Sequence, residues 1–342
     1  MIYTKTKLSE YTVAFSAIFF IGIILSAPSV CAQGARYGLN ICADVLIPSL
    51  FPFSIPVLFL INTNAYIDSK RKIPILFVLS LLGGYPIGAK LISELYSSGI
   101  IRQDYAKRLV PFCVNAGPAF IIIAVGKSIL GSVKIGSILF FSHILSSVLL
   151  FGIFAVKEPY QKMHYSNGNK ETTVSENIVI SVHNASNACL SICAFVVMFS
   201  VINQYLLFYS SRFVFLKYLI YLTEVTSAVN GTKNIYLISF LLGFSGISIW
   251  MQIYSMSTEI KPNIYYFVFI RISHGILSSL FTAIFIKALK ISIYTMSNNR
   301  AVSEKLFYSD YYLSISLLLM VFLLIISVSS KKHSGNLLRD ML

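Results

Sequence analysis

Residues 81–88 read Leu-Leu-Gly-Gly-Tyr-Pro-Ile-Gly and interrupt an apolar stretch at about 73–98. Residues 241–248 read Leu-Leu-Gly-Phe-Ser-Gly-Ile-Ser and interrupt a second stretch at about 235–258, at an offset of 160 residues. Upstream, residues 49–53 align more weakly with 193–197. Apolar segments broken by Gly or Pro at corresponding places in two halves of a chain are typical of secondary transporters, whose binding sites lie at the breaks. The sequence therefore predicts two structural repeats, each with a broken helix.

The composition indicates a membrane protein and argues against a soluble enzyme. Of the 342 residues, 56% are hydrophobic and 12% are charged, and the mean hydropathy is +0.76. A soluble globular chain carries about 25% charged residues. A bilayer is crossed by about 20 apolar residues, and runs of that length fall at roughly 11–30, 41–62, 107–128, 132–156, 179–210, 263–289 and 308–328. We expect an all-α polytopic protein of the cell membrane.

The charges suggest how the chain meets the membrane. The net charge of +14 is spread over loops between the apolar runs, which points to anionic lipid in the bilayer and not to nucleic acid. A cytoplasmic N-terminus would place 15 of the 27 lysines and arginines inside, a weak bias that leaves the orientation open. The first run could be a signal peptide cleaved near residues 30–32, but its length and the spans that follow favour a retained helix.

The first broken segment has the lengths of a re-entrant hairpin. Residues 74–83 and 88–98 would each form about 15 Å of helix, which is half the hydrocarbon core. The glycines permit the chain to reverse, and Pro86 cannot donate to a continuous helix. The alternative is one kinked spanning helix, and it is stronger for the second segment, which lacks the proline.

Charged and polar residues in or near the apolar segments are candidates for function, because charges are costly within a bilayer. Lys90 and Glu94 lie four residues apart after the first break; they form an internal ion pair, or Lys90 faces an anionic ligand beside a half-helix N-terminus. Arg271 is a second anion clamp, or it extends from a helix end to the interface.

Two further segments carry polar groups. Asn115-Ala116-Gly117-Pro118 interrupts the run at 107–128, and its carbonyls can coordinate a cation or substrate unless the turn is only a packing kink. Glu224, followed by Thr226, is the candidate for binding a coupling sodium ion or proton, or it pairs with Lys217 or Lys233. Since no nucleotide-binding loop, nucleophile motif or metal-spaced cluster occurs in the sequence, we expect no enzyme, no cofactor and no metal.

Several blocks of the sequence resemble a known family. They are residues 35–40 (ARYGLN), 46–53 (LIPSLFPF), 84–95 (GYPIGAKLISEL), 108–120 (RLVPFCVNAGPAF), 222–226 (LTEVT) and 243–248 (GFSGIS). Together they look like the sporulation integral membrane protein YlbJ (SpoVV) family, whose halves carry nucleoside-recognition "Gate" repeats. The resemblance covers about residues 12–290, and the second tip has Ser245 where the family pattern suggests glycine.

The resemblance implies a fold similar to concentrative nucleoside transporters, with two re-entrant helical hairpins facing a midplane site. The implied organisation is an N-terminal transmembrane helix (1–32), a first Gate-like repeat (33–156) with hairpin 73–98, a polar linker (157–177), a second Gate-like repeat (178–291) with hairpin 235–258, and a C-terminal transmembrane helix with a basic tail (292–342). Our candidate substrate-binding residues, drawn from this resemblance and from the polar positions above, are Gly84, Tyr85, Pro86, Gly88, Lys90, Asn115, Gly117, Gly243, Ser245, Gly246, Ser248 and Arg271. Glu224 and Thr226 are the candidates for the coupling ion.

The resemblance also implies a function in endospore formation, namely movement of dipicolinic acid across the outer forespore membrane. Because dipicolinate is a dianion, Lys90 in the first tip favours a small anionic substrate over a neutral nucleoside, which would need carboxamides and carboxylates. We therefore predict a transporter or facilitator of a small organic anion. A nucleoside or base transporter and a non-transporting membrane scaffold are the alternatives, and an oligomer is compatible with each of them. A scaffold would pair its buried polar groups and leave Lys90 without a cavity.

Overall fold

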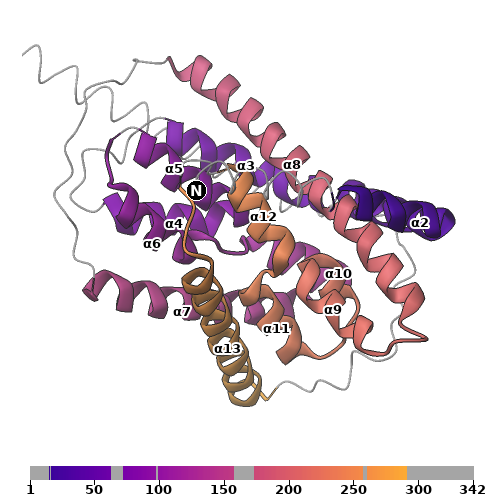
Figure 1. Ribbon diagram of the computed structural model, residues 1–342. Helices are drawn as coiled ribbons and strands as arrows, with labels where there is room; N and C mark the ends of the chain where they lie inside the picture. Colours follow the sequence, from indigo (N-terminus) through magenta and orange to yellow (C-terminus); the bar gives the residue numbers. More distant parts are fainter. Residues whose placement is uncertain are drawn as a thin grey trace, which may run out of the picture.

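The structure, a computed structural model, describes residue 15 and residues 17–62, 72–97, 99–157, 173–256 and 260–290. These residues form helices and short connections, with no strand among them (Figure 1). The all-α prediction is therefore confirmed for the described part of the chain. The predicted polar linker and the predicted span at 308–328 lie wholly or mostly outside it.

The first half contains a long curved helical run followed by broken helices. Its elements are α2 (Pro28–Ile41), η1 (Cys42–Leu46), α3 (Ile47–Asn62), α4 (Lys72–Gly83), α5 (Tyr85–Ser97), α6 (Gln103–Cys113), η2 (Ala119–Ile129) and α7 (Val133–Lys157). The α2–η1–α3 run passes through a π-helical turn and continues through Pro52 and Pro56. The run at 107–128 is not one helix: the chain unwinds between Cys113 and Ala119, where the predicted interruption at Asn115–Pro118 lies.

The second half starts with the longest helix. Its elements are α8 (Val174–Tyr209), α9 (Phe215–Thr223), α10 (Val225–Asn230), α11 (Ile235–Phe244), α12 (Gly246–Met256) and α13 (Ile264–Ala288). Thr173 and Glu176 begin α8 with a reciprocal capping box, which satisfies two backbone N–H groups at the helix start. Helices α8 and α13 confirm the predicted spans at 179–210 and 263–289 to within a few residues.

The breaks predicted from the glycine motifs are present in both halves. Gly84 separates α4 from α5, and Ser245 separates α11 from α12; both residues have positive φ. Helices α4 and α5 pack against each other. By contrast, the segment Ile235–Tyr254, with its break included, is long and apolar enough to cross a membrane. The second segment therefore fits the alternative of a kinked spanning helix better than a hairpin.

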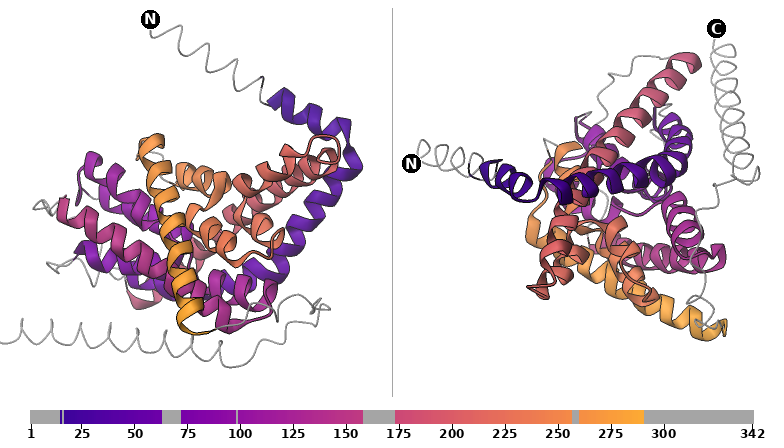
Figure 2. Two further views of the ribbon diagram at one scale, coloured as in Figure 1. Left: turned by 90° about the horizontal axis from the view of Figure 1, so that it is seen from below. Right: turned by 90° about the vertical axis from the view of Figure 1, so that its right-hand side faces the viewer.

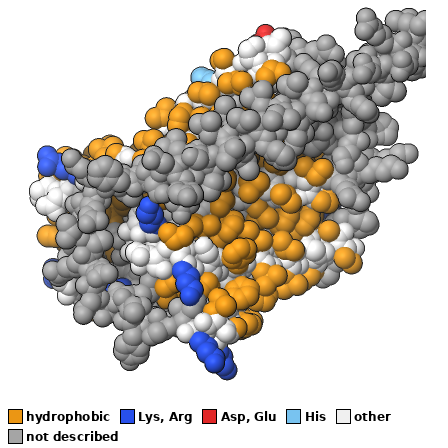
Figure 3. Space-filling model, turned by 180° about the vertical axis from the view of Figure 1, so that it is seen from behind, with side chains coloured by type: hydrophobic (Ala, Val, Ile, Leu, Met, Phe, Trp, Pro, Cys, Tyr) orange, Lys and Arg blue, Asp and Glu red, His pale blue; other side chains and the backbone are white. Residues whose placement is uncertain are grey.

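Among the residues that the structure describes, five helical segments are long and apolar enough to cross a membrane, which supports a multi-pass membrane protein. They are Pro28–Leu60, Val133–Val156, Val174–Tyr209, Ile235–Tyr254 and Ile264–Ala288. The outward side chains of α13, including Phe269, Ile276 and Leu280, are more than half exposed, whereas Arg271 and His274 on the same helix are buried. Such an inverted pattern, apolar outside and polar inside, suits lipid, and one face of the molecule is largely hydrophobic (Figure 3).

Close backbone contacts hold the helices together. Helix α2 packs along α8, and Gly34 and Gly38 lie against Val197, Ser200 and Val201 with no room for a side chain. Helix α13 packs on α7 and α11, as two views of the ribbon show (Figures 1 and 2). In a membrane the hydrophobic effect does not drive helices together, because the lipid tails are as apolar as the side chains. Small residues at helix contacts allow close packing there, which favours association. This packing brings the breaks of both halves together.

Candidate functional site

A cavity lies where the unwound segments of the two halves meet. Its walls come from α3, the α4–α5 break, the α6–η2 turn, α8, the α9–α10 turn and α12. The polar side chains among its described lining residues are Ser54, Tyr85, Glu224, Thr226 and Gln252. The cavity volume is about 30 Å³, which suffices for about two water molecules. The structure thus shows the site closed, and an organic substrate would require the walls to move apart.

Glu224 is the charged residue of this lining. It is the N-cap of α10, where its two carboxylate oxygens accept the backbone N–H groups of Thr226 (2.8 Å) and Ser227 (2.6 Å). Only 1% of the residue is exposed. Within the described residues no lysine or arginine forms an ion pair with it, so the pairing with Lys217 or Lys233 is not formed. The side chains of Thr226 and Ser227 also interact with this carboxylate, whose two oxygens offer about four acceptor positions.

Gln252 is a second polar group of the cavity. It is fully buried, and its side-chain amide donates to the Ser248 hydroxyl at 3.3 Å. The residue follows the second break by two helical turns and shares a face of α12 with Ile249, which also lines the cavity. It was not among the candidate site residues; a carboxamide in an otherwise apolar helix after the break was the signal that could have found it.

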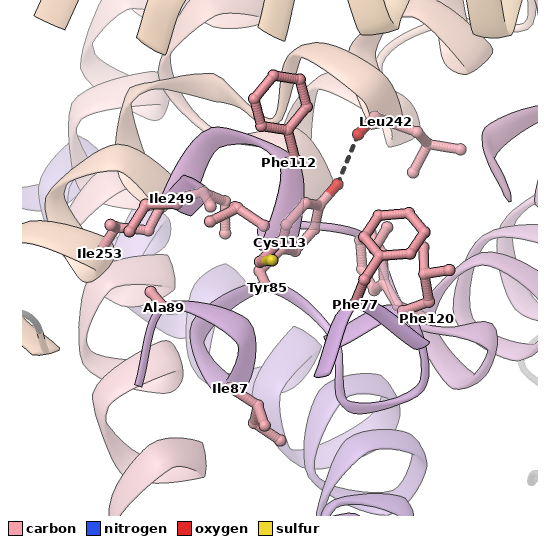
Figure 4. Packing of buried hydrophobic residues seen from close by; sticks show 14 of the residues in the cluster. Phe77, Tyr85, Ile87, Ala89, Phe112, Cys113, Phe120, Leu242, Ile249 and Ile253 are labelled. Carbon is pink, nitrogen blue, oxygen red and sulfur yellow. Dashed lines mark hydrogen bonds between the residues drawn. The ribbon is translucent and has the colours of Figure 1, made fainter. Parts of the chain in front are cut away.

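The first break approaches the rest of the site through its backbone. Gly84 has a φ of +84°, and a side chain there would approach the backbone of Gly117. The next residue, Tyr85, donates its hydroxyl to the Leu242 carbonyl oxygen at 2.7 Å (Figure 4). Leu242 lies in α11, close to the second break. The two broken segments are therefore joined directly by a buried hydrogen bond.

The α6–η2 turn is secured by protein groups. The Asn115 side chain donates to the Phe112 carbonyl oxygen at 2.7 Å and accepts from Ser147 at 3.0 Å. The N–H of Ala116 donates to His143 at 3.1 Å. The Asn115 side chain and the Ala116 N–H are therefore bonded to other parts of the protein. Gly117 is the residue of this turn that lines the cavity.

Arg271 connects the halves and does not reach the interface. Arg271 is only 1% exposed. Its guanidinium donates to the Val114 carbonyl oxygen and to the Ser245 hydroxyl, both at 2.6 Å. It does not line the cavity. Val114 and Ser245 both lie where a helix is interrupted, one in each half. The structure thus gives Arg271 a positioning role between the α6–η2 turn and the second break.

Lys90 forms the ion pair with Glu94 that was one of the two alternatives. The two charged atoms are 3.9 Å apart, and both side chains are partly exposed. Lys90 does not line the cavity. The expectation that it faces a ligand in this site therefore finds no support in the closed geometry.

The remaining candidates divide by position. Those that line the cavity are Gly84, Tyr85, Gly117, Glu224 and Thr226. Helix packing occupies Gly88 against Cys113 and Gly243 against Gly275, while Gly246 lies near the backbone of Thr223. Ser245 contacts Arg271, and Ser248 contacts Gln252. Pro86 stands in the first turn of α5.

Comparison with known proteins gives one distant relative. The chain is 21% identical over 345 residues to the sporulation integral membrane protein YlbJ of Bacillus subtilis (strain 168), and the match covers 83% of this chain and 84% of that protein. This chain is a distant homologue of YlbJ. The match includes most of the described helices, because it extends over more than four fifths of the chain. No protein-family model matches the chain, and no solved structure matches it.

Proposed function

We propose that the protein is a secondary transporter or facilitator of a small organic molecule, in which Glu224 binds the coupling proton or sodium ion. One observation carries the proposal: a buried carboxylate, with no ion-pair partner among the described residues, lines a cavity formed by helix breaks of both halves. Ionisable groups buried within membranes usually mark ion or substrate pathways. Breaks from two halves that meet at one site are the arrangement of transporters that use alternating access.

Dipicolinic acid is the substrate that the family resemblance implies, and the proposed place of action is the outer forespore membrane during sporulation. The similarity to a sporulation integral membrane protein supports that setting. A dianion next to Glu224 requires a compensating charge, because no lysine or arginine is among the described lining residues. A proton or a cation on Glu224 supplies that compensation, so coupling and anion binding would occur together.

A nucleoside or base is the second candidate substrate, and the lining favours it. Such a substrate requires carboxamides and carboxylates for its hydrogen bonds, and Gln252 and Glu224 supply one of each. The aromatic rings of Tyr85 and Phe120 also belong to the lining and could stack on a base. The cavity lining therefore supports a nucleoside or base as a second candidate substrate, to be tested together with dipicolinate.

The scaffold alternative explains part of the structure. It predicts paired buried polar groups, and the buried Arg271 and Asn115 are hydrogen-bonded, while the partly exposed Lys90 pairs with Glu94. It gives no reason for a carboxylate buried beside a cavity with no counter-charge among the described residues, which costs stability. Glu224 is therefore the residue on which transport and scaffold differ most clearly.

The test is uptake into proteoliposomes. The full chain is assayed with labelled dipicolinate and labelled uridine, with and without a proton or sodium gradient. We expect gradient-dependent uptake by the wild type and at least a tenfold loss in Glu224→Gln, because the amide does not take up a proton at neutral pH and binds a cation poorly. Glu94→Gln is the matched control, since Glu94 lies outside the cavity lining.

The outcomes separate the proposals. Dipicolinate uptake that uridine does not compete identifies the anion, and the reverse identifies a nucleoside or base. Lys90→Ala should leave uptake unchanged, because Lys90 is engaged with Glu94. Absence of uptake of either compound by folded wild type, under every gradient, would overturn transport of both and favour the scaffold. Equal uptake by wild type and Glu224→Gln would refute the assigned role of Glu224.

A further inference from the structure

A second, larger cavity lies behind the α9–α10 turn, away from the closed site. Its volume is about 290 Å³; it is partly open to the outside, and α2, the C-terminal part of α8, α9 and α10 line it, with Lys217 and Asn230 exposed. Side chains that matter for its chemistry are Tyr37, Ser200, Asn203, Lys217, Ser227 and Asn230. Ligand pockets in proteins begin at about 300 Å³, so this cavity has room for a small polar group.

Two buried polar atoms in its walls have no hydrogen-bond partner among the described residues. They are the Ser200 hydroxyl and the Asn203 amide nitrogen. The two residues are 1% and 6% exposed. Because a buried polar group without a partner destabilises the fold, two such groups beside one cavity point to a polar guest.

The charge and the donors of the lining specify the guest. Lys217 is the charged residue of the cavity, and no aspartate or glutamate is among its described lining residues. Its ammonium group only donates hydrogen bonds. The Asn203 oxygen already accepts from Thr223, which leaves its amide nitrogen for the guest. The Tyr37 hydroxyl accepts from Asn230 and keeps its own proton to donate. A guest that suits these groups is negatively charged and rich in acceptors.

We propose that this cavity binds a phosphate group, with Lys217 as its cation and Ser200 and Asn203 as its donors. The group would come from an anionic lipid or from free phosphate. A lipid is geometrically feasible, because α9 exposes apolar side chains on both sides of Lys217, including Phe215 and Tyr218. The proposal is independent of the transport function, since none of these side chains lines the cavity of Glu224.

The experiment uses the full chain purified in a phosphate-free maltoside detergent. One arm adds inorganic phosphate, and the other adds short-chain phosphatidylglycerol; chloride at matched ionic strength is the reference. Binding is measured by calorimetry and by the shift in melting temperature. We expect saturable binding in at least one arm, and the arm that saturates identifies the source of the phosphate group.

The variants test the assignment. Lys217→Met should weaken binding about tenfold, whereas Lys233→Met, an exposed lysine outside the cavity lining, should leave it unchanged. Asn203→Leu should also weaken binding. Absence of saturable binding in both arms, or equal affinity in Lys217→Met and the wild type, would overturn the proposal.

Discussion

Ser245 adopts a backbone conformation that normally belongs to glycine. Its φ is +77°, in the left-handed region, which costs a non-glycine residue about 1–2 kcal/mol. The family resemblance suggests glycine at this position, and the observed backbone explains why glycine suits it. In this chain the serine hydroxyl accepts from the Arg271 guanidinium at 2.6 Å, and a hydrogen bond to a charged group contributes about 1.5–3 kcal/mol. The bond to Arg271 therefore offsets the strain of the serine.

Substitutions at Ser245 can separate strain from hydrogen bonding. Ser245→Ala keeps the strain and removes the partner of a buried guanidinium donor, so we expect a loss of about 2 kcal/mol in unfolding free energy. Ser245→Gly removes the bond but relieves the strain, so it should fall between alanine and the wild type. Thermal unfolding in detergent measures the order. A glycine variant that melts below the alanine variant would show that strain plays no part.

At the scale of elements, α5 and α6 pack through a glycine. A β-carbon added at Gly88 would lie 1.7 Å from the Cys113 carbonyl oxygen, which is backbone and cannot move aside. Gly88→Ala should therefore separate the two helices and destabilise the protein by about 3 kcal/mol or more, at the upper end of overpacking costs. The yield of monodisperse protein and its melting temperature are the measurements.

Gly152→Ala is the matched control for that prediction. Gly152 lies on the exposed side of α7 with no atom within 4 Å of an added β-carbon. The alanine should be neutral or slightly stabilising, because alanine favours helix over glycine by about 1 kcal/mol. A similar fall in yield and melting temperature in both variants would mean that any substitution of a helical glycine destabilises this protein. The contact with Cys113 would then not be the cause.

The elements were predictable where a single local signal determines them. Glycine with positive φ determines the break at Gly84, and apolar length determines α8 and α13. The unwinding after Cys113 was visible as the Asn115–Pro118 interruption, but its bonds to His143 and Arg271 depend on residues far along the chain. For the same reason the sequence could not decide whether Lys90 faces Glu94 or a ligand: the side that a helix presents to a cavity is fixed by packing.

At the scale of the whole molecule, buried hydrogen bonds connect the two halves close to the closed site. Among them, Tyr85 of the first half donates to Leu242 of the second, and Arg271 of the second half donates to Val114 of the first. The first bond joins the two broken helical segments, and the second joins α13 to the unwound chain after α6. Opening a cavity of about 30 Å³ to admit an organic substrate requires the halves to separate, so these contacts stabilise the closed state.

The Tyr85 contact gives a direct test of this opening. Tyr85→Phe keeps the ring but removes the hydroxyl, so the closed state loses about 1 kcal/mol and the open population rises about fivefold. A cysteine placed at Ser54, in the cavity lining, reports the change in a chain whose native cysteines are replaced. Its reaction with a water-soluble thiol reagent should accelerate about fivefold in the Phe variant. An unchanged rate, with the fold intact, would show that this bond does not control access to the cavity. The reagent would then reach the cysteine at position 54 equally fast in both variants, which means that the population of open molecules is the same.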